Sequence, residues 1–414
     1  MKPRNYGAIA LLTVFTFFER FAYYGFRSTV VPRLLTEGGM ASTRISMIMS
    51  LSMMATILGL AIGGGLSLAT RNRFLLAGGA LLLVLVHGVA AAAPMLGLFV
   101  LPVVGGLLRP LVYVAAAEEL DQEGRVWKAV VVASLFYGAT NVGAAFSAVV
   151  GGTREASLYL SYALPVVAAV VALVPCAILA FAIPGAPFRW ATHEALVSGS
   201  PQQAPYRPEP GVRRGGGGPS PWILLVVLGA MFFSNCAQTA QGDAAFAAID
   251  EGGLARTMRW VQMLNPVIVT VMGVLLVALG AYLASTRARL SPTWFFGAGL
   301  GLQALALLVT AVAFSGHSQG LAIGGSVFDA LGEGVAAPIA IGYVLGTLSS
   351  RWVGLVASGY SVLAILPNMV LSPLLARREA MIPVLVLSAL FLLVAAVLTL
   401  VLGPRLHRGG DAAA

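Results

Sequence analysis

The chain has 414 residues, of which 58% are hydrophobic and 10% are charged, and its formal net charge is +9. A soluble domain carries about a quarter charged residues, and a soluble chain this apolar would expose large patches that aggregate. The composition excludes a soluble multidomain protein and indicates that lipid surrounds most of the chain. Because the basic residues fall mostly in short loops between apolar runs, we interpret the positive charge as membrane topology and expect no nucleic-acid partner.

Twelve apolar runs are long enough to cross the hydrocarbon core of a bilayer, which needs about 20 residues of helix. In chain order they cover 7–35, 44–69, 74–93, 95–117, 127–151, 158–184, 221–247, 257–285, 291–314, 319–348, 352–376 and 380–403. The first run is too long for a signal peptide and is therefore predicted to be a membrane span. Because all twelve are also too long for barrel strands, the sequence predicts an all-α membrane protein.

A segment rich in proline, glycine and serine, residues 185–220, interrupts the spans and divides six from six. This composition is typical of a flexible linker. The predicted domains are an N-terminal six-helix bundle (1–184), a cytoplasmic linker (185–220), a C-terminal six-helix bundle (221–403) and a cytoplasmic tail (404–414). The arrangement resembles the major facilitator fold, in which two halves move around a site near the middle of the membrane.

Ionisable groups within a span are costly in lipid and mark candidate functional sites. The segment "TFFERFAYYGFR" of the first span places its polar side chains on one helix face at steps of three and four. These residues are Thr16, Glu19, Arg20, Tyr23, Tyr24 and Arg27. We expect this face to line a hydrated cavity; the alternative is that Glu19 and Arg20 pair with other helices and only stabilise packing.

Other spans carry polar residues one turn apart. They are Arg109 with Tyr113, Tyr137 with Asn141, Asn235 with Gln238 and Gln241, Gln262 with Asn265, and Asp329 with Glu333. The amides are equally consistent with hydrogen bonds that tie helices together. Guanidinium groups in the first half and a carboxylate in the second suit a zwitterion such as a short peptide or an amino acid.

Several motifs resemble those of the proton-dependent oligopeptide transporter family, and they occur in the expected order along nearly the whole chain. "ERFAYYG" (19–25) is similar to the first-helix signature ExxERFxYYG, and "GGLLRP" (105–110) resembles the fourth-helix motif with Arg109 in place of lysine. "FYGATNVGA" (136–144) resembles FYxxINxG of the fifth helix. "LNP", "LGEGVAAPIAIGY" and "RWVGLVASGY" fit the eighth, tenth and eleventh helices. The chain thus resembles a short, divergent member of this family.

The resemblance implies proton-driven import of di- and tripeptides by alternating access, with no cofactor and no metal. Arg20 and Arg109 would hold the peptide carboxylate. The amino terminus would be held by Asn141, Asn265 and Glu333, and the pocket would also be lined by Tyr23, Tyr24, Tyr113 and Gln238. Proton coupling and gating would involve Glu19, Arg27, Asp329 and Glu333.

Two departures from the family pattern leave the coupling mechanism open. Thr16 and Ala237 stand where the family carries glutamates, so two groups that could carry a proton are missing. We hypothesise that Asp329 replaces the lost gate acid opposite Arg27 and carries the coupled proton with Glu333. The alternative is that Asp329 is simply solvated in an outer vestibule.

Two other functions remain open at this point. One is a transporter or facilitator of another small organic anion or zwitterion, with altered or no proton coupling. The other is a membrane sensor that binds its ligand without transport. An enzyme is not expected, because the sequence contains no HExxH, GxSxG or phosphate-loop motif. We expect a monomer in the inner membrane of a cell, whose partners are lipid, protons and a small zwitterionic substrate.

The distribution of lysine and arginine predicts that both termini are cytoplasmic, because cytoplasmic loops are enriched in these residues. On that topology the cytoplasmic segments hold fifteen of the 25, namely Lys2, Arg4, Arg71, Arg73, Arg125, Lys128, Arg189, Arg207, Arg213, Arg214, Arg287, Arg289, Arg351, Arg405 and Arg408. The opposite loops hold seven, namely Arg33, Arg44, Arg154, Arg256, Arg259, Arg377 and Arg378. The remaining three lie within spans.

A reporter enzyme fused after Ala414 tests this topology. We expect a reporter that works only in the cytoplasm to be active, and one that works only outside it to be inactive. The opposite pair of results would show that the termini face outward.

Overall fold

The computed structural model describes residues 3–36, 42–69, 73–120, 125–151, 158–182, 222–247, 251–286, 290–348, 350–375 and 378–408. These residues form α-helices, with no strand among them. The helices are α1 (Pro3–Thr36), α2 (Ser42–Ala69), α3 (Arg73–Ala92), α4 (Pro94–Glu118), α5 (Arg125–Gly151), α6 (Leu158–Phe181), α8 (Trp222–Ala247), α9 (Glu251–Ser285), α10 (Pro292–Ser315), α11 (Gln319–Thr347), α12 (Ser350–Leu375) and α13 (Arg378–Arg408).

Ten of the described helices are long and apolar enough to cross a membrane, which confirms the all-α membrane class. The two others are α1 and α12. Helix α1 carries Glu19, Arg20 and Arg27 in its middle, and the apolar part of α12 is limited to Trp352–Pro367. Whether these two helices span the bilayer therefore stays a prediction.

Each predicted span corresponds to one described helix, and the differences lie at the ends. Helix α9 begins at Glu251 rather than at 257, and α13 continues to Arg408, past the predicted end at 403. The first residues of the predicted tail are therefore helical. The predicted linker at 185–220 lies outside the described residues, so the domain boundaries remain predictions.

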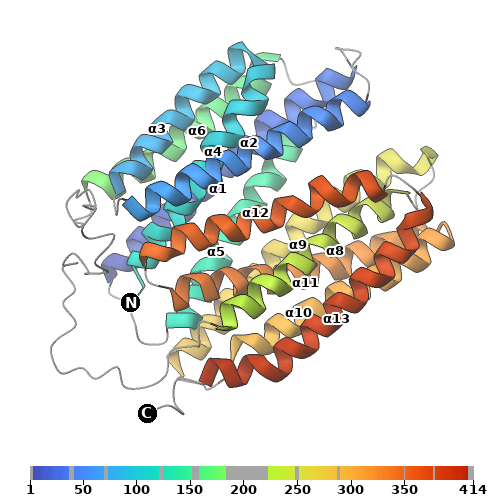
Figure 1. The fold of residues 1–414 in the computed structure, drawn as a ribbon. Helices are drawn as coiled ribbons and strands as arrows, with labels where there is room; N and C mark the ends of the chain where they lie inside the picture. Colours follow the sequence, from blue (N-terminus) through green and yellow to red (C-terminus); the bar gives the residue numbers. More distant parts are fainter. Residues whose placement is uncertain are drawn as a thin grey trace.

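By their order along the chain the helices are treated as two groups (Figure 1). The N-terminal group is α1–α6 and the C-terminal group is α8–α13, and both α5 and α12 pack more extensively against helices of the other group than against those of their own. The groups touch where α5 packs against α9 and α11, and where α12 packs against α2 and α4. A side chain on α4, α5, α11 or α12 can therefore reach the interface between the groups.

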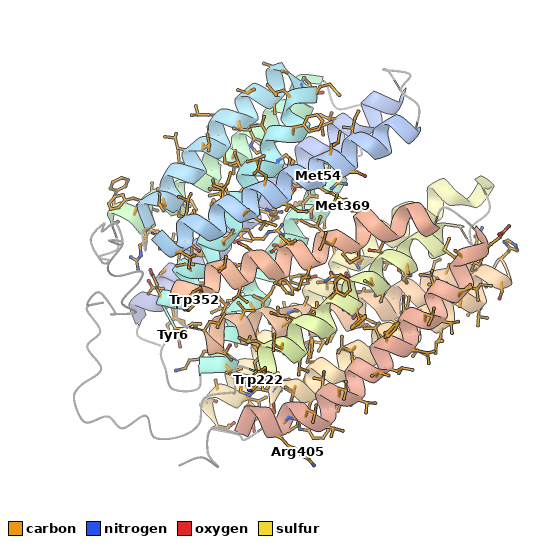
Figure 2. The ribbon with its side chains drawn as sticks, viewed as in Figure 1. Tyr6, Met54, Trp222, Trp352, Met369 and Arg405 are labelled. Carbon is orange, nitrogen blue, oxygen red and sulfur yellow. The ribbon has the colours of Figure 1, made fainter. Side chains whose placement is uncertain are left out.

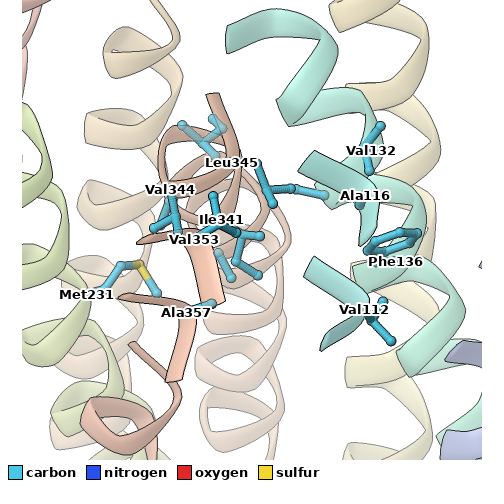
Figure 3. Close-up of a cluster of buried hydrophobic side chains, with 14 of the residues drawn as sticks. Val112, Ala116, Val132, Phe136, Met231, Ile341, Val344, Leu345, Val353 and Ala357 are labelled. Atoms are coloured by element: carbon cyan, nitrogen blue, oxygen red, sulfur yellow. The ribbon is translucent and has the colours of Figure 1, made fainter. Parts of the chain in front are cut away.

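An apolar cluster joins the two groups (Figure 3). From α4 and α5 it contains Val112, Ala116, Val132 and Phe136, and from α8, α11 and α12 it contains Met231, Ile341, Val344, Leu345, Val353 and Ala357. Helices in lipid associate through close packing of small residues, because lipid tails are as apolar as the side chains. Gly342 of α11 provides such a contact, since a Cβ there would lie 2.8 Å from Cα of Val130.

A tryptophan of α5 adds a polar contact between the groups. The indole Nε1 of Trp127 donates a hydrogen bond to the carbonyl oxygen of Leu290, at 2.9 Å. The indole also meets Phe295 of α10 edge to face, with the ring centroids 5.9 Å apart. The start of α5 is thus fixed to the start of α10.

Exposed aromatic residues mark one end of the molecule (Figure 2). Tyr6, Trp222 and Trp352 are exposed and lie with Arg405 at one end of the molecule. Tryptophan and tyrosine are enriched at membrane–water interfaces. This end therefore has the composition of an interfacial belt.

Close approach of α1 and α5 depends on Gly143. A Cβ at this position would lie 2.6 Å from the carbonyl oxygen of Phe17 and 3.0 Å from the backbone nitrogen of Phe21. These atoms belong to the backbone of α1 and cannot move away alone. Gly138, also on α5, has nothing within 4 Å of an added Cβ.

We therefore expect Gly143→Ala to destabilise the protein by about 1–3 kcal/mol, the usual effect of overpacking. Gly138→Ala is the matched control and should keep or raise the unfolding temperature, because alanine favours helix over glycine. The measurement is thermal unfolding of both purified variants in the same detergent. Equal unfolding temperatures would contradict the close contact.

Candidate functional site

Glu19 and Arg20 form a buried ion pair on α1. The Arg20 Nη2 donates a hydrogen bond to Glu19 Oε1 at 2.7 Å, and Arg20 Nε donates to Glu19 Oε2. Both residues are buried, with Glu19 4% exposed and Arg20 6% exposed. A bidentate pair satisfies both charges at a depth where either one alone would be costly. Arg20 is therefore already bonded to a carboxylate before any substrate arrives.

Two neighbouring features hold this pair in place. The guanidinium of Arg20 lies over the ring of Tyr23, 5.4 Å from its centroid, and Tyr23 meets Tyr24 edge to face at 5.3 Å. Gly105 of α4 leaves room for the pair, because a Cβ there would lie 3.3 Å from Glu19 Oε1. The two sequence motifs that contain these residues thus meet in space.

Arg109 and Arg27 are half-buried, and neither makes an ion pair or hydrogen bond among the described residues. Arg109 of α4 lies close enough to Tyr113 and to Tyr360 of α12 to interact with them electrostatically. An arginine without a protein partner at this depth is available to an anion. Arg109 therefore carries a charge that no described ion pair or hydrogen bond compensates.

Glu333 of α11 is the matching acid, and it is bonded from two other helices. The hydroxyl of Tyr137 on α5 donates a hydrogen bond to Glu333 Oε1. Nδ2 of Asn265 on α9 donates one to Glu333 Oε2 at 3.1 Å. Tyr360 lies within electrostatic range of Glu333 as well as of Arg109. Tyr360 is thus within electrostatic range of a cation of the N-terminal group and of an acid of the C-terminal group.

Asp329 lies in a polar network that the sequence did not indicate. Its Oδ1 accepts a hydrogen bond from Gln303 Nε2 of α10 at 3.5 Å, and Gln303 Oε1 accepts one from Ser234 of α8 at 2.6 Å. Asp329 is buried, with 5% exposure, so the alternative of a solvated side chain in an outer vestibule does not describe this structure. No described ion pair joins it to Arg27.

The predicted amides divide between local and longer-range bonds. Asn141 and Asn235 donate to carbonyl oxygens of their own helices, those of Tyr137 and Met231. Gln241 donates to Ser326 Oγ at 2.9 Å and so ties α8 to α11. Gln238 is half-buried and makes no hydrogen bond within the described part of the chain. The helix-tying alternative is thus correct for Gln241.

Thr16 and Ala237 stand where the peptide transporter family carries glutamates, and both contribute to helix structure and packing. Thr16 donates its hydroxyl to the carbonyl oxygen of Leu12 at 2.8 Å, and Ala237 is fully buried. Neither position provides an acid. The carboxyl groups of Glu19 and Asp329 are buried, and that of Glu333 is half-buried.

Two tyrosines of the site were quoted in motifs but given no role from the sequence. Tyr137 stands at the start of "FYGATNVGA", and Tyr360 ends "RWVGLVASGY". Gln303 and Ser234 had no signal, because a lone amide or hydroxyl in an apolar run is common. The ends of the two motifs could have identified both tyrosines.

A groove of about 400 Å³ lies between α1, α5 and α9, but it is not the polar site. Its lining is almost entirely apolar and includes Val14, Phe17, Leu135 and Val274. None of the charged residues described above contributes to it. The candidate site is instead formed by the polar residues Arg109, Glu333 and Tyr360.

The fold is shared with solved transporter structures. The chain is similar to an auto-inhibited POT family peptide transporter (15% identity, TM-score 0.57, covering 96% of this chain and 97% of that one). It is also similar to a mutant of the peptide transporter POT in complex with sulfate (18%, 0.60, 97% and 95%) and to the human organic anion transporter MFSD10 (14%, 0.66, 96% and 100%). No protein-family model and no curated protein matches the chain.

These likenesses establish the fold. The chain folds like a membrane transporter of the peptide and organic anion type. The solved structures it resembles are transporters rather than enzymes, in agreement with the expectation from its motifs. At 14–18% identity they do not assign a substrate.

The Glu19–Arg20 pair generates a stability prediction. Arg20→Met leaves a buried carboxylate without its cation, and Glu19→Gln leaves a buried guanidinium without its anion. Removing one partner of a buried pair costs about 3–5 kcal/mol. We expect each single variant to unfold at lower temperature in detergent, and the double variant to be less destabilised than the sum of the two. Strict additivity would contradict a direct interaction.

Proposed function

We propose that the chain is a secondary active transporter that imports di- and tripeptides by proton symport through alternating access. The observation that carries the proposal is that Tyr360 of α12 lies within electrostatic range of Arg109 on α4 and of Glu333 on α11, where these three helices are in contact. A short peptide carries a carboxylate and an ammonium at opposite ends. A cation on one group and an acid on the other would bind both ends and so connect the groups.

In this proposal Arg109 is the primary anchor of the peptide carboxylate. Arg20 contributes after its pair with Glu19 rearranges, because its Nε and Nη2 both donate hydrogen bonds to that carboxylate in this structure. The ammonium is held by Glu333 with Asn141 and Asn265, and the peptide body lies against Tyr23, Tyr24, Tyr113 and Gln238. The half-buried state of most of these residues supports their access to a substrate.

Proton coupling in this proposal rests on Glu19, Arg27, Asp329 and Glu333. Glu333 and Asp329 are one turn apart on α11, and both are served by amide donors from neighbouring helices. Two carboxyl groups this close interact strongly, so that they share protons as a pair. Arg27, without a described partner, supplies the cation of the outer gate.

The proposed topology places both termini, the linker at 185–220 and the aromatic end of the molecule at the cytoplasmic face of an inner membrane. The two helix groups then act as the two rocking halves, each a six-helix bundle in a monomeric protein. Their contact through the apolar cluster and Gly342 lies near the ends of α4 and α11. It is the contact that must open toward the cytoplasm.

A second function, transport of another organic anion or zwitterion with altered or no proton coupling, is favoured by two observations. Thr16 and Ala237 replace acids of the peptide-transporter pattern, and the human organic anion transporter has a higher TM-score than either peptide transporter compared above. Uptake by proteoliposomes separates the functions. Peptide uptake that rises with an inward proton gradient supports the first, and uptake of organic anions alone supports the second.

The anchoring role of Arg109 predicts a specific loss of binding. Arg109→Ala should weaken binding of dialanine by about 2–5 kcal/mol, the range for truncating one partner of a desolvated charge pair. The native protein should discriminate against dialanine amide, and the variant should not. Arg405→Ala, at an exposed site on α13, is the control and should bind like the native protein. Equal binding of dialanine and its amide by the native protein would reject this anchor.

A further inference from the structure

The hydrogen bond between Tyr137 and Glu333 joins two parts of the molecule that the proposed transport cycle separates. Tyr137 lies on α5 of the N-terminal group, and Glu333 lies on α11 of the C-terminal group. Asn265, the other donor to Glu333, lies on α9 of the same group as the acid. Of the two bonds on this carboxylate, one is internal to a group and the other crosses between groups.

Each oxygen of Glu333 already accepts one hydrogen bond in this structure. Oε1 accepts from the phenol of Tyr137 and Oε2 accepts from the amide of Asn265. A substrate ammonium on Glu333 must approach one of these oxygens to within hydrogen-bond distance. The hydroxyl of Tyr137, a neutral hydrogen-bond donor on α5, takes the position next to Oε1.

We propose that the Tyr137 hydroxyl is a built-in competitor that occupies the ammonium subsite of Glu333 until a substrate displaces it. The inference rests on the proposed function, because it takes Glu333 as the acid that binds the peptide amine. An ammonium forms a charge-assisted hydrogen bond with a carboxylate, which is roughly twice as strong as the bond from a neutral donor. A neutral ligand end, such as an acetylated amine, has no such advantage and leaves Tyr137 in place.

Displacement has a consequence for the two helix groups. When the phenol leaves Oε1, one hydrogen bond between α5 and α11 is lost, while the bond from Asn265 within the C-terminal group remains. The substrate amine therefore breaks a contact that holds the groups together. This makes Tyr137 a positioning residue that links occupancy of the amine subsite to release of α5 from α11.

The test compares Tyr137→Phe with the native protein in nanodiscs, using dialanine and N-acetyl-dialanine as probes. The change removes only the competing hydroxyl. We expect the Kd of dialanine to fall about 2- to 10-fold, the range for loss of one competing hydrogen bond. The Kd of N-acetyl-dialanine should change less than dialanine's, because that ligand has no ammonium. In a Glu333→Gln background, the same change at Tyr137 should no longer tighten dialanine binding.

Tyr343→Phe is the control, because it removes a buried phenol of α11 that contacts Ser291 at 3.4 Å within the C-terminal group. It should leave the preference for dialanine over the acetylated probe unchanged. If Tyr137→Phe does not fold, Tyr137→Met also removes the hydroxyl and must give the same tightening. Unchanged or weaker binding of dialanine by a folded variant overturns the inference but not the peptide function. A native protein that binds neither probe overturns both.

Discussion

The energetic cost of charge within a bilayer governs how this chain is arranged. Each ionisable side chain at membrane depth needs a partner, a polar neighbour or water, since an uncompensated charge costs several kcal/mol. The chain meets this requirement in different ways at different places. Glu19 and Arg20 satisfy each other within one helix, Glu333 collects donors from two other helices, and Asp329 takes one amide donor from α10. Arg109 makes no ion pair or hydrogen bond among the described residues.

Charged side chains that are bonded to protein partners can thus be told apart from charged side chains that are available to a ligand. A bidentate pair such as Glu19–Arg20 is costly to disturb, so it resists exchange with a substrate carboxylate unless another cation or anion compensates. Arg109 has no such commitment among the described residues. Sequence position alone assigns Arg20 and Arg109 equal roles. The structure distinguishes them by what each guanidinium already binds.

Much of the fold could be predicted from the sequence, because a long apolar run in lipid has little choice but to form a helix. The predicted run 44–69 corresponds to α2, Ser42–Ala69. Helix ends were less accurate, as at Glu251, where polar residues extend α9 beyond the apolar core. The spacing of Tyr137 and Asn141 correctly placed both on one face, but periodicity within α5 says nothing about which helix lies opposite. The bond from Tyr137 to Glu333 and the network of Gln303 depend on packing between segments far apart in the chain, and that required the structure.

The hydrogen bond from Trp127 to the Leu290 carbonyl gives the protein an internal optical probe. Indole emission shifts to longer wavelength when a buried ring becomes hydrated, and Trp127 is buried against Phe295 in the present arrangement. Any movement that draws the start of α5 away from α10 must break this bond and separate the two rings. Of the six tryptophans in the chain, Trp222, Trp294 and Trp352 are already exposed on the outer surface. A change in emission that disappears with Trp127→Phe would therefore report the relative motion of the two helix groups without any attached dye.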